Sequence, residues 1–367
     1  MAFGVEVVLA SKVELARGQP ALTNRRASSR QTSRERLPWP EDKPFRILSL
    51  DGGGIKGVYA STLLRAVEDH LAGDSSIGDY FDLIAGTSTG GIIAVGLGLR
   101  HRAAAIDEMY RLRGNKIFPP SPRGLETVTD LARFFKQLFR PKFDATVLES
   151  ELSGILRNAH FGDSLNRLVI PAFIVPKAEI AVFKTDHHPD YRYDHLMMAW
   201  EVARATSAAP TFIAGLEDGG HIFLDGGLWA NNPIIVAIVE AMSAFDISLG
   251  QLQVLSIGTG SSQFEISRTA ALLGIWSWRF ALNAAMYLTT DNATAQAQLL
   301  IGHENVCRVD PGSVGHSIQM DDWEQATKIL PREAEKNFEA RRPEILRFFQ
   351  EKCEPRLHFR DNQSGQV

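Results

Sequence analysis

From residue 45 onward, short continuous apolar runs alternate with longer stretches that have helical spacing of apolar positions. The short runs predict buried strands at 45–50, 80–85, 167–174, 179–185, 221–224 and 252–257. The longer stretches predict helices at 58–71, directly after 88, and at 195–205, 233–244 and 323–349. Alternating strands and helices are typical of an α/β fold, in which a mostly parallel central sheet is covered by helices on both faces.

Three segments of the chain differ in composition. Residues 1–43 are polar and include a cluster of arginines and serines before two prolines, which predicts a flexible basic N-terminal arm. Residues 44–350 carry the strand and helix pattern and are expected to form one catalytic domain. Residues 351–367 are expected to form a C-terminal tail that frays at its end.

The overall composition favours a globular protein in a reducing compartment. The chain has 367 residues, 44% of them hydrophobic, and a net charge of −4, which argues against binding a nucleic-acid polymer. Its two cysteines, Cys307 and Cys353, cannot build a disulfide framework. Residues 1–10 lack the basic start of a secretory signal, and the apolar stretch 81–99 is interrupted by an aspartate and a serine turn. We therefore expect a cytoplasmic protein.

The most informative motif is the run Gly86-Thr87-Ser88-Thr89-Gly90, which lies between a predicted strand and a predicted helix. In a G-x-S-x-G turn the serine backbone is strained, and glycine at both flanking positions avoids clashes of a Cβ atom. The hydroxyl is then exposed at the carboxyl edge of the sheet. Ser88 is therefore a candidate nucleophile.

A second motif is Asp51-Gly52-Gly53-Gly54-Ile55-Lys56-Gly57, which follows the first strand and opens a helix. Consecutive glycines let backbone N–H groups approach a ligand atom closely, as an oxyanion hole requires. Gly52, Gly54 and Gly57 also fit G-x-G-x-x-G, so dinucleotide binding stays an alternative. No acidic residue follows the next strand at the expected distance, which weighs against that alternative.

The third motif, Asp225-Gly226-Gly227, comes at the end of a predicted strand. From there a carboxylate can reach a serine on a neighbouring strand and act as its base. The alternative is a turn aspartate that accepts hydrogen bonds from its own backbone.

These three motifs together resemble the patatin-like phospholipase family. The resemblance covers roughly residues 44–310 and rests on the runs 51–57, 86–90 and 225–227, with the stretches 203–210 and 255–260 also similar. It implies a three-layer α/β/α fold and hydrolysis of lipid esters through a serine–aspartate dyad without a metal or cofactor.

By this resemblance, Ser88 is the nucleophile, Asp225 its dyad partner, and Gly52, Gly53 and Gly54 form the oxyanion hole. The residues that support the motifs are Asp51, Lys56, Gly57, Gly86, Gly90, Gly226 and Gly227. The chain departs from the family at Lys56, where arginine is usual, so this position offers a point donor in place of a planar, two-pronged one.

More narrowly, the chain resembles the phospholipase effectors of bacterial anti-phage systems that signal through cyclic oligonucleotides. This resemblance implies activation by a cyclic dinucleotide and attack on membrane phospholipids from the inner surface, where the active enzyme is peripheral. It assigns no nucleotide-binding residues. Two alternatives stay open: a lipid acylhydrolase or esterase without nucleotide control, and a Ser–Asp–His hydrolase in which His303 or His316 completes the triad.

Three further segments have two interpretations each. Residues 131–143 mix phenylalanines with cations, which suits either an interfacial segment or an amphipathic helix with buried aromatics. Residues 270–288 are rich in large apolar side chains and form either the wall of an acyl-chain channel or a buried helix. His187 and His188 suggest a metal site or, more simply, a surface turn.

Overall fold

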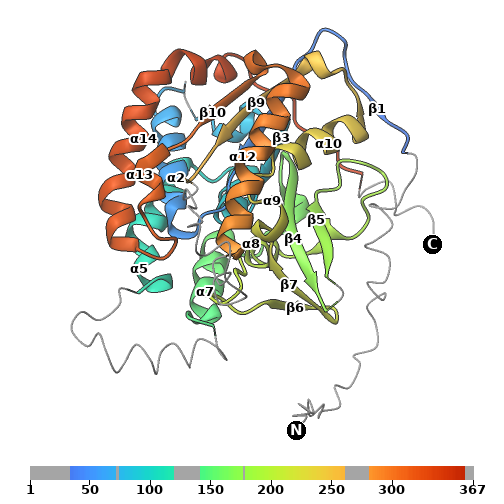
Figure 1. Cartoon of the computed structure of the whole chain (residues 1–367). Helices are drawn as coiled ribbons and strands as arrows, with labels where there is room; N and C mark the ends of the chain where they lie inside the picture. Colours follow the sequence, from blue (N-terminus) through green and yellow to red (C-terminus); the bar gives the residue numbers. More distant parts are fainter. Residues whose placement is uncertain (1–33, 72–73, 120–140, 177, 261–280, 360–367) are drawn as a thin grey trace, which may run out of the picture.

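The computed structural model describes residues 34–71, 74–119, 141–176, 178–260 and 281–359. An eight-stranded mixed sheet crosses the molecule in the order β10-β9-β2-β3-β4-β7-β6, with β5 paired to β4 (Figure 1). Its strands are β2 (Phe45–Leu50), β3 (Leu83–Gly86), β4 (Arg167–Val175), β5 (Glu179–Lys184), β6 (Leu216–Asp218), β7 (His221–Asp225), β9 (Leu252–Ile257) and β10 (Val306–Val309). The five strands from β10 to β4 are parallel, and β5, β6 and β7 are joined by antiparallel pairs.

Helices cover both faces of this sheet. They are α2 (Gly57–Glu68), α3 (Thr89–Gly98), α4 (Ala103–Glu108), the π-helix η4 (Met109–Arg113), α5 (Gly114–Ile117), α7 (Ala145–Leu156), α8 (Ala199–Thr206), α9 (Gly227–Ala230), α10 (Ile234–Ala244), α12 (Ala281–Ile301), α13 (Gly312–His316) and α14 (Trp323–Leu346). Single 3₁₀ turns are η2 (Gly54–Lys56), η3 (Ile77–Tyr80), η5 (Phe161–Asp163), η6 (Asp194–Leu196), η7 (Leu249–Gln251), η9 (His303–Asn305) and η10 (Arg347–Phe349).

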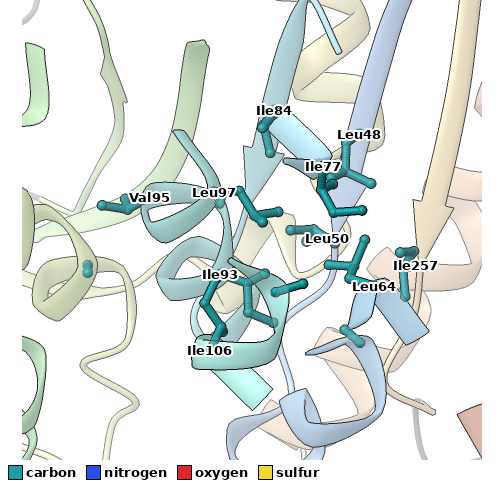
Figure 2. Close-up of a cluster of buried hydrophobic side chains, with 14 of the residues drawn as sticks. Leu48, Leu50, Leu64, Ile77, Ile84, Ile93, Val95, Leu97, Ile106 and Ile257 are labelled. Atoms are coloured by element: carbon teal, nitrogen blue, oxygen red, sulfur yellow. The ribbon is translucent and has the colours of Figure 1, made fainter. Parts of the chain in front are cut away.

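Alternate strand residues point to two separate cores, as expected for a sheet buried on both faces. On one face, Leu48, Leu50 and Ile84 pack against α2, α3 and α4, as Figure 2 shows. On the other face, Ile47 and Leu83 pack against α10 and α12. The three-layer α/β/α prediction is therefore confirmed.

Most predicted elements are present, and the differences have local causes. β3 begins at Leu83 rather than at residue 80, because residues 77–80 form the turn η3, capped by Ser76 and Asp79. α8 begins at Ala199 rather than at 195, because Met198 is extended. The pattern missed β6, β10 and α7, since their apolar runs are short or interrupted.

Both ends of the described chain pack on the domain. Residues 34–43, which we predicted as part of a flexible arm, lie against it: Leu37–Pro38 pairs as β1 with Phe245–Asp246 (β8), and the Trp39 ring lies 4.7 Å from that of Phe45. In the predicted tail, the fully buried Arg356 forms an ion pair with Asp186 at 2.6 Å. Buried aromatic and ionic contacts hold these segments on the domain. Residues 1–33 of the predicted arm and 360–367 of the predicted tail lie outside the described residues. The predicted domain boundaries stay predictions.

Within the described ranges, no helix combines the length and apolar character needed to cross a bilayer.

Candidate active site

Ser88 occupies a strained turn between β3 and α3. Its φ of 55° and ψ of −124° lie in a region that non-glycine residues rarely adopt. The neighbouring glycines allow this close packing: a Cβ on Gly86 would lie 2.1 Å from the carbonyl oxygen of Gly90, and one on Gly90 would lie 2.3 Å from that of Leu50. The predicted serine turn thus has the expected geometry.

Asp225 ends β7 and is 3% exposed. Its carboxylate lies beside the Ser88 side chain and accepts a hydrogen bond from the N–H of Gly227 at 2.7 Å. Burial raises the pKa of Asp225 to about 6, although the neighbouring Gly227 N–H and Ser88 hydroxyl both favour the ionised form. Gly226 is required because a Cβ there would lie 2.3 Å from the carbonyl oxygen of Pro171.

Thr206, at the end of α8, holds the backbone of Ser88 and of Gly226, the residue after Asp225. Its Oγ1 accepts the N–H of Ser88 at 3.0 Å and donates to the carbonyl of Pro171 at 2.6 Å. Its own carbonyl accepts the N–H of Gly226 at 3.3 Å. Sequence reasoning assigned no role to this residue, although the run 203–210 was among the stretches that carried the family resemblance.

Gly52 lies directly beside the serine, since a Cβ on it would come within 3.1 Å of the Ser88 Cβ. Its N–H donates to the carbonyl of Asn231 at 3.0 Å. Its single donor is therefore engaged in this structure, and the prediction that Gly52 supplies an oxyanion donor stays a prediction. Gly52 allows the loop to approach Ser88 closely.

The N–H groups of Gly53 and Gly54 have no acceptor among the described residues. Both positions need glycine: a Cβ on Gly53 would lie 2.2 Å from Oγ1 of Thr259, and Gly54 has a φ of +58° with the carbonyl of Met320 close by. These two donors line the same pocket as Ser88.

Contacts of Asp51 and Lys56 hold the glycine loop 51–57 in place. Asp51 forms a two-pronged ion pair with Arg308 of β10, with N–O distances of 2.9 and 2.6 Å. Lys56 is buried, donates to the carbonyl of Gly260, and has its pKa lowered to about 8 by burial. Lys56 thus donates a single hydrogen bond, to a backbone carbonyl. Gly57 leaves room for the Thr89 side chain, because a Cβ on residue 57 would lie 2.1 Å from Oγ1 of Thr89.

A predominantly apolar pocket opens from Ser88 and Asp225. Its walls come mainly from α3, η4, α5, α7 and the segment after α8, with Ile92, Met109, Ile117, Leu148, Phe212 and Ile213 among the lining residues. An apolar pocket with a serine, a carboxylate and free backbone donors gathered in it suits a ligand with a polar ester group and a hydrocarbon chain.

The alternative sites do not form in this structure. His303 precedes β10 and His316 lies in α13, and neither hydrogen-bonds to Ser88 or Asp225. Gly52 and Gly57 face protein atoms rather than an open phosphate cradle. His187 bonds to the side chains of Thr185 and Glu240, and the described residues contain no cluster of metal-ligating side chains.

Two predicted lipid-contacting segments lie largely outside the described residues. From the first, 131–143, the described Phe143 packs its ring 5.3 Å from Phe118 and 6.3 Å from Phe212, both of which line the pocket. From the second, 270–288, the end lies in α12. The two interpretations of each segment stay predictions.

Comparison with known proteins identifies the family of this chain. The family model described as patatin-like phospholipase matches residues 48–238. A cGAMP-activated phospholipase of Escherichia coli (strain TW11681) is 36% identical over 309 residues, which cover 80% of this chain and 83% of the relative. One from Vibrio cholerae is 31% identical, covering 63% and 70%, and patatin-like protein 2 of Arabidopsis thaliana is 31% identical, covering 68% and 66%.

The chain belongs to the patatin-like phospholipase family. It is accordingly a lipid acyl hydrolase, and the family resemblance seen in the three sequence motifs is confirmed.

Proposed function

We propose that this protein is a phospholipase of the A type that cleaves membrane glycerophospholipid esters through a Ser88–Asp225 dyad and is activated by a cyclic dinucleotide. The observation that carries the catalytic part is that the Ser88 side chain lies beside the buried carboxylate of Asp225 within the apolar pocket. A serine next to a base, free backbone donors and an apolar cleft are the parts that acyl transfer requires.

In the acylation step, Ser88 Oγ attacks the ester carbonyl carbon while its proton passes to Asp225. The carbonyl oxygen becomes negative and accepts hydrogen bonds from the N–H groups of Gly53 and Gly54. The tetrahedral intermediate then collapses, the bond to the alcohol oxygen breaks, and Asp225 returns the proton to that oxygen. The lysophospholipid leaves, and an acyl ester remains on Ser88.

In the deacylation step, a water molecule gives a proton to Asp225 and attacks the acyl carbonyl. The bond to Ser88 Oγ breaks, the serine oxygen takes the proton back from Asp225, and the fatty acid is released. A carboxyl pKa near 6 leaves Asp225 ionised at neutral pH and keeps it a stronger base than an exposed aspartate. These steps use neither a metal nor an organic cofactor.

The regulatory part rests on the relatives. Proteins of Escherichia coli and Vibrio cholerae named cGAMP-activated phospholipases align with most of this chain. By likeness to them, a cyclic dinucleotide made on infection would switch on hydrolysis of the host's own membrane as an anti-phage defence. The enzyme would then work in the cytoplasm, bound peripherally to the inner membrane surface while active.

The test is fatty-acid release from phospholipid vesicles by wild type, Ser88→Ala and Asp225→Asn, with and without a panel of cyclic dinucleotides. We expect release that needs both residues and one nucleotide, while Ser150→Ala, at an exposed serine of α7, behaves as wild type. Full activity of either dyad variant would overturn the mechanism. Dyad-dependent release without any nucleotide would leave a constitutive lipase and remove the regulatory part.

A further inference from the structure

A second cavity, here called the back groove, lies between α2, η4 and α14. It contains cations, carboxylates and an aromatic ring pair: Arg65, His70, Arg111, Glu335, Phe338 and Glu339. We propose that the back groove binds one phosphate and the adjoining purine of the activating cyclic dinucleotide. The proposal rests on the proposed function, which gives this protein a nucleotide activator but no site for it.

Two arginines of the back groove are held on a fully buried carboxylate. Asp107 accepts the Thr62 hydroxyl at 2.7 Å and forms ion pairs with Arg65 at 3.2 Å and Arg111 at 2.9 Å. The two guanidinium side chains are 47% and 32% exposed, so each can still donate outward. Two arginines prearranged by one buried anion suit a phosphate, because less side-chain entropy is lost on binding.

The rest of the back groove suits a purine. The His70 ring lies 5.0 Å from the buried Phe338 ring, and its Nδ1 lies 2.7 Å from the Ala66 carbonyl, which fixes the ring in place. The outer face of His70 offers a stacking surface for a base. Glu335 and Glu339 supply the acceptors that the N1–H and amino group of guanine need.

The carboxylates also limit what can bind. They repel an extended polyanion such as a nucleic-acid strand, whereas a small ligand can place its phosphate at Arg65 and Arg111 and its base edge at Glu335. A cavity that holds both positive and negative groups therefore matches a nucleotide better than inorganic phosphate alone.

The back groove and the catalytic pocket have one wall element in common, the π-helix η4. α2 begins at Gly57, directly after the glycine loop, and Arg111 belongs to the same π-helical turn as Tyr110. Tyr110 lines the catalytic pocket and donates its hydroxyl to the carbonyl of Thr89, the residue after Ser88, at 3.1 Å. Single π-helical turns occur frequently at functional sites. If the ligand contacts Arg111 better in one of two conformations of this turn, its binding favours that conformation. The position of Tyr110 and the start of α3 then shift with the turn.

The experiment is calorimetric titration of cGAMP into the full chain as wild type, Arg65→Gln, Arg65→Lys, Glu335→Ala and Lys336→Ala. Arg65→Gln leaves Asp107 paired with Arg111, so the fold survives, which thermal unfolding checks. We expect its affinity to fall at least about tenfold, since a charge-assisted hydrogen bond is lost, and Arg65→Lys to recover part of it. Glu335→Ala should reduce the preference for cGAMP over cyclic di-AMP. Lys336→Ala, 73% exposed on the same helix, should bind like wild type.

Unchanged affinity in both Arg65→Gln and Glu335→Ala would overturn the back groove as the site while leaving nucleotide control intact. A wild type that binds no cyclic dinucleotide would overturn the regulatory part of the proposed function together with this site, and dyad-dependent hydrolysis would still be measurable. Amide hydrogen exchange on wild type gives a second measurement: cGAMP should slow exchange in α2 and α14, and protection confined to other elements would contradict the proposal.

Discussion

Thr206 holds Ser88 in its strained conformation, because its Oγ1 accepts the Ser88 N–H at 3.0 Å from a position 118 residues further along the chain. The same hydroxyl donates to the carbonyl of Pro171 at 2.6 Å, so one fully buried side chain ties the serine turn to β4. Both backbone groups depend on this hydroxyl, which makes Thr206 a positioning residue for the proposed nucleophile.

Replacing Thr206 with valine keeps the shape and removes both hydrogen bonds. Leaving buried polar groups unpaired costs roughly 1–3 kcal/mol each, and we expect kcat to fall at least about tenfold with a smaller change in KM. Thr206→Ser keeps the hydroxyl and should retain most of the activity. Steady-state fatty-acid release and thermal unfolding of both variants check this, and equal activity of valine and serine variants would contradict it.

The pH dependence follows from Asp225, whose pKa is raised to about 6 by burial. As a base it must be ionised, so kcat/KM should rise with pH through about 6. Its folded-state pKa lies above the ordinary aspartate value of 3.8, so this group's contribution to the free energy of unfolding decreases as pH rises from 3.8 to about 6.

Asp225→Asn separates the two effects. The amide cannot take the Ser88 proton, so activity should be lost, yet no buried charge remains at neutral pH. We therefore expect the variant to unfold at a higher denaturant concentration than wild type at pH 7.5, with a smaller difference at pH 4. Urea unfolding at both pH values measures this difference. A variant less stable than wild type at pH 7.5 would show that the interactions of the ionised carboxylate stabilise the fold by more than its burial destabilises it.

The sequence predicted the parts of the site that local chemistry determines. Gly86, Ser88 and Gly90 are recognisable because a tight strand-to-helix turn demands small residues at fixed spacing. Asp225 was recognisable because a carboxylate followed by glycines marked the end of a strand. Local patterns also predicted the strands and helices that carry these residues.

Long-range contacts account for what the sequence did not reveal. Arg308 pairs with Asp51 across 257 positions, on a strand too short to stand out in the hydrophobic pattern. A run of three glycines does not show which N–H donates a hydrogen bond within the protein. The Gly52 N–H donates to the carbonyl of Asn231, which lies far along the chain. The roles of such residues depend on the tertiary fold.

The Asp51–Arg308 ion pair gives a third prediction. Arg308→Met leaves the 2% exposed Asp51 without its partner, and we expect a loss of about 3–5 kcal/mol in the free energy of unfolding together with reduced activity. The double variant Asp51→Asn/Arg308→Met removes the unpaired charge and should recover part of the stability. Denaturant unfolding of both variants tests this. Equal stability of the single and double variants would mean that the Asp51 charge is neutralised in another way.

The fourth prediction concerns the N-terminal anchor. The Arg34 side chain is 9% exposed, lies 3.5 Å from Asp190 and 3.8 Å from Glu240, and stacks 4.9 Å above the Tyr191 ring. Arg34→Ala should therefore lower the free energy of unfolding by about 1–3 kcal/mol, because the buried Glu240 and the partly exposed Asp190 both lose a charged contact.

Arg36 provides the matched control for this anchor. It is 51% exposed and its partner Asp246 is 76% exposed, so Arg36→Ala should cost less than about 1 kcal/mol. Both arginines lie near the amino ends of the strands, whereas Ser88 follows the carboxyl end of β3, so hydrolysis of a soluble ester should be unchanged in both variants. Thermal unfolding distinguishes them: a drop in Tm for Arg34→Ala alone supports a specific anchor. An equal effect of the two variants would mean that residues 34–36 are held by their backbone contacts, including the hydrogen bond from His188 to the Glu35 carbonyl at 2.9 Å.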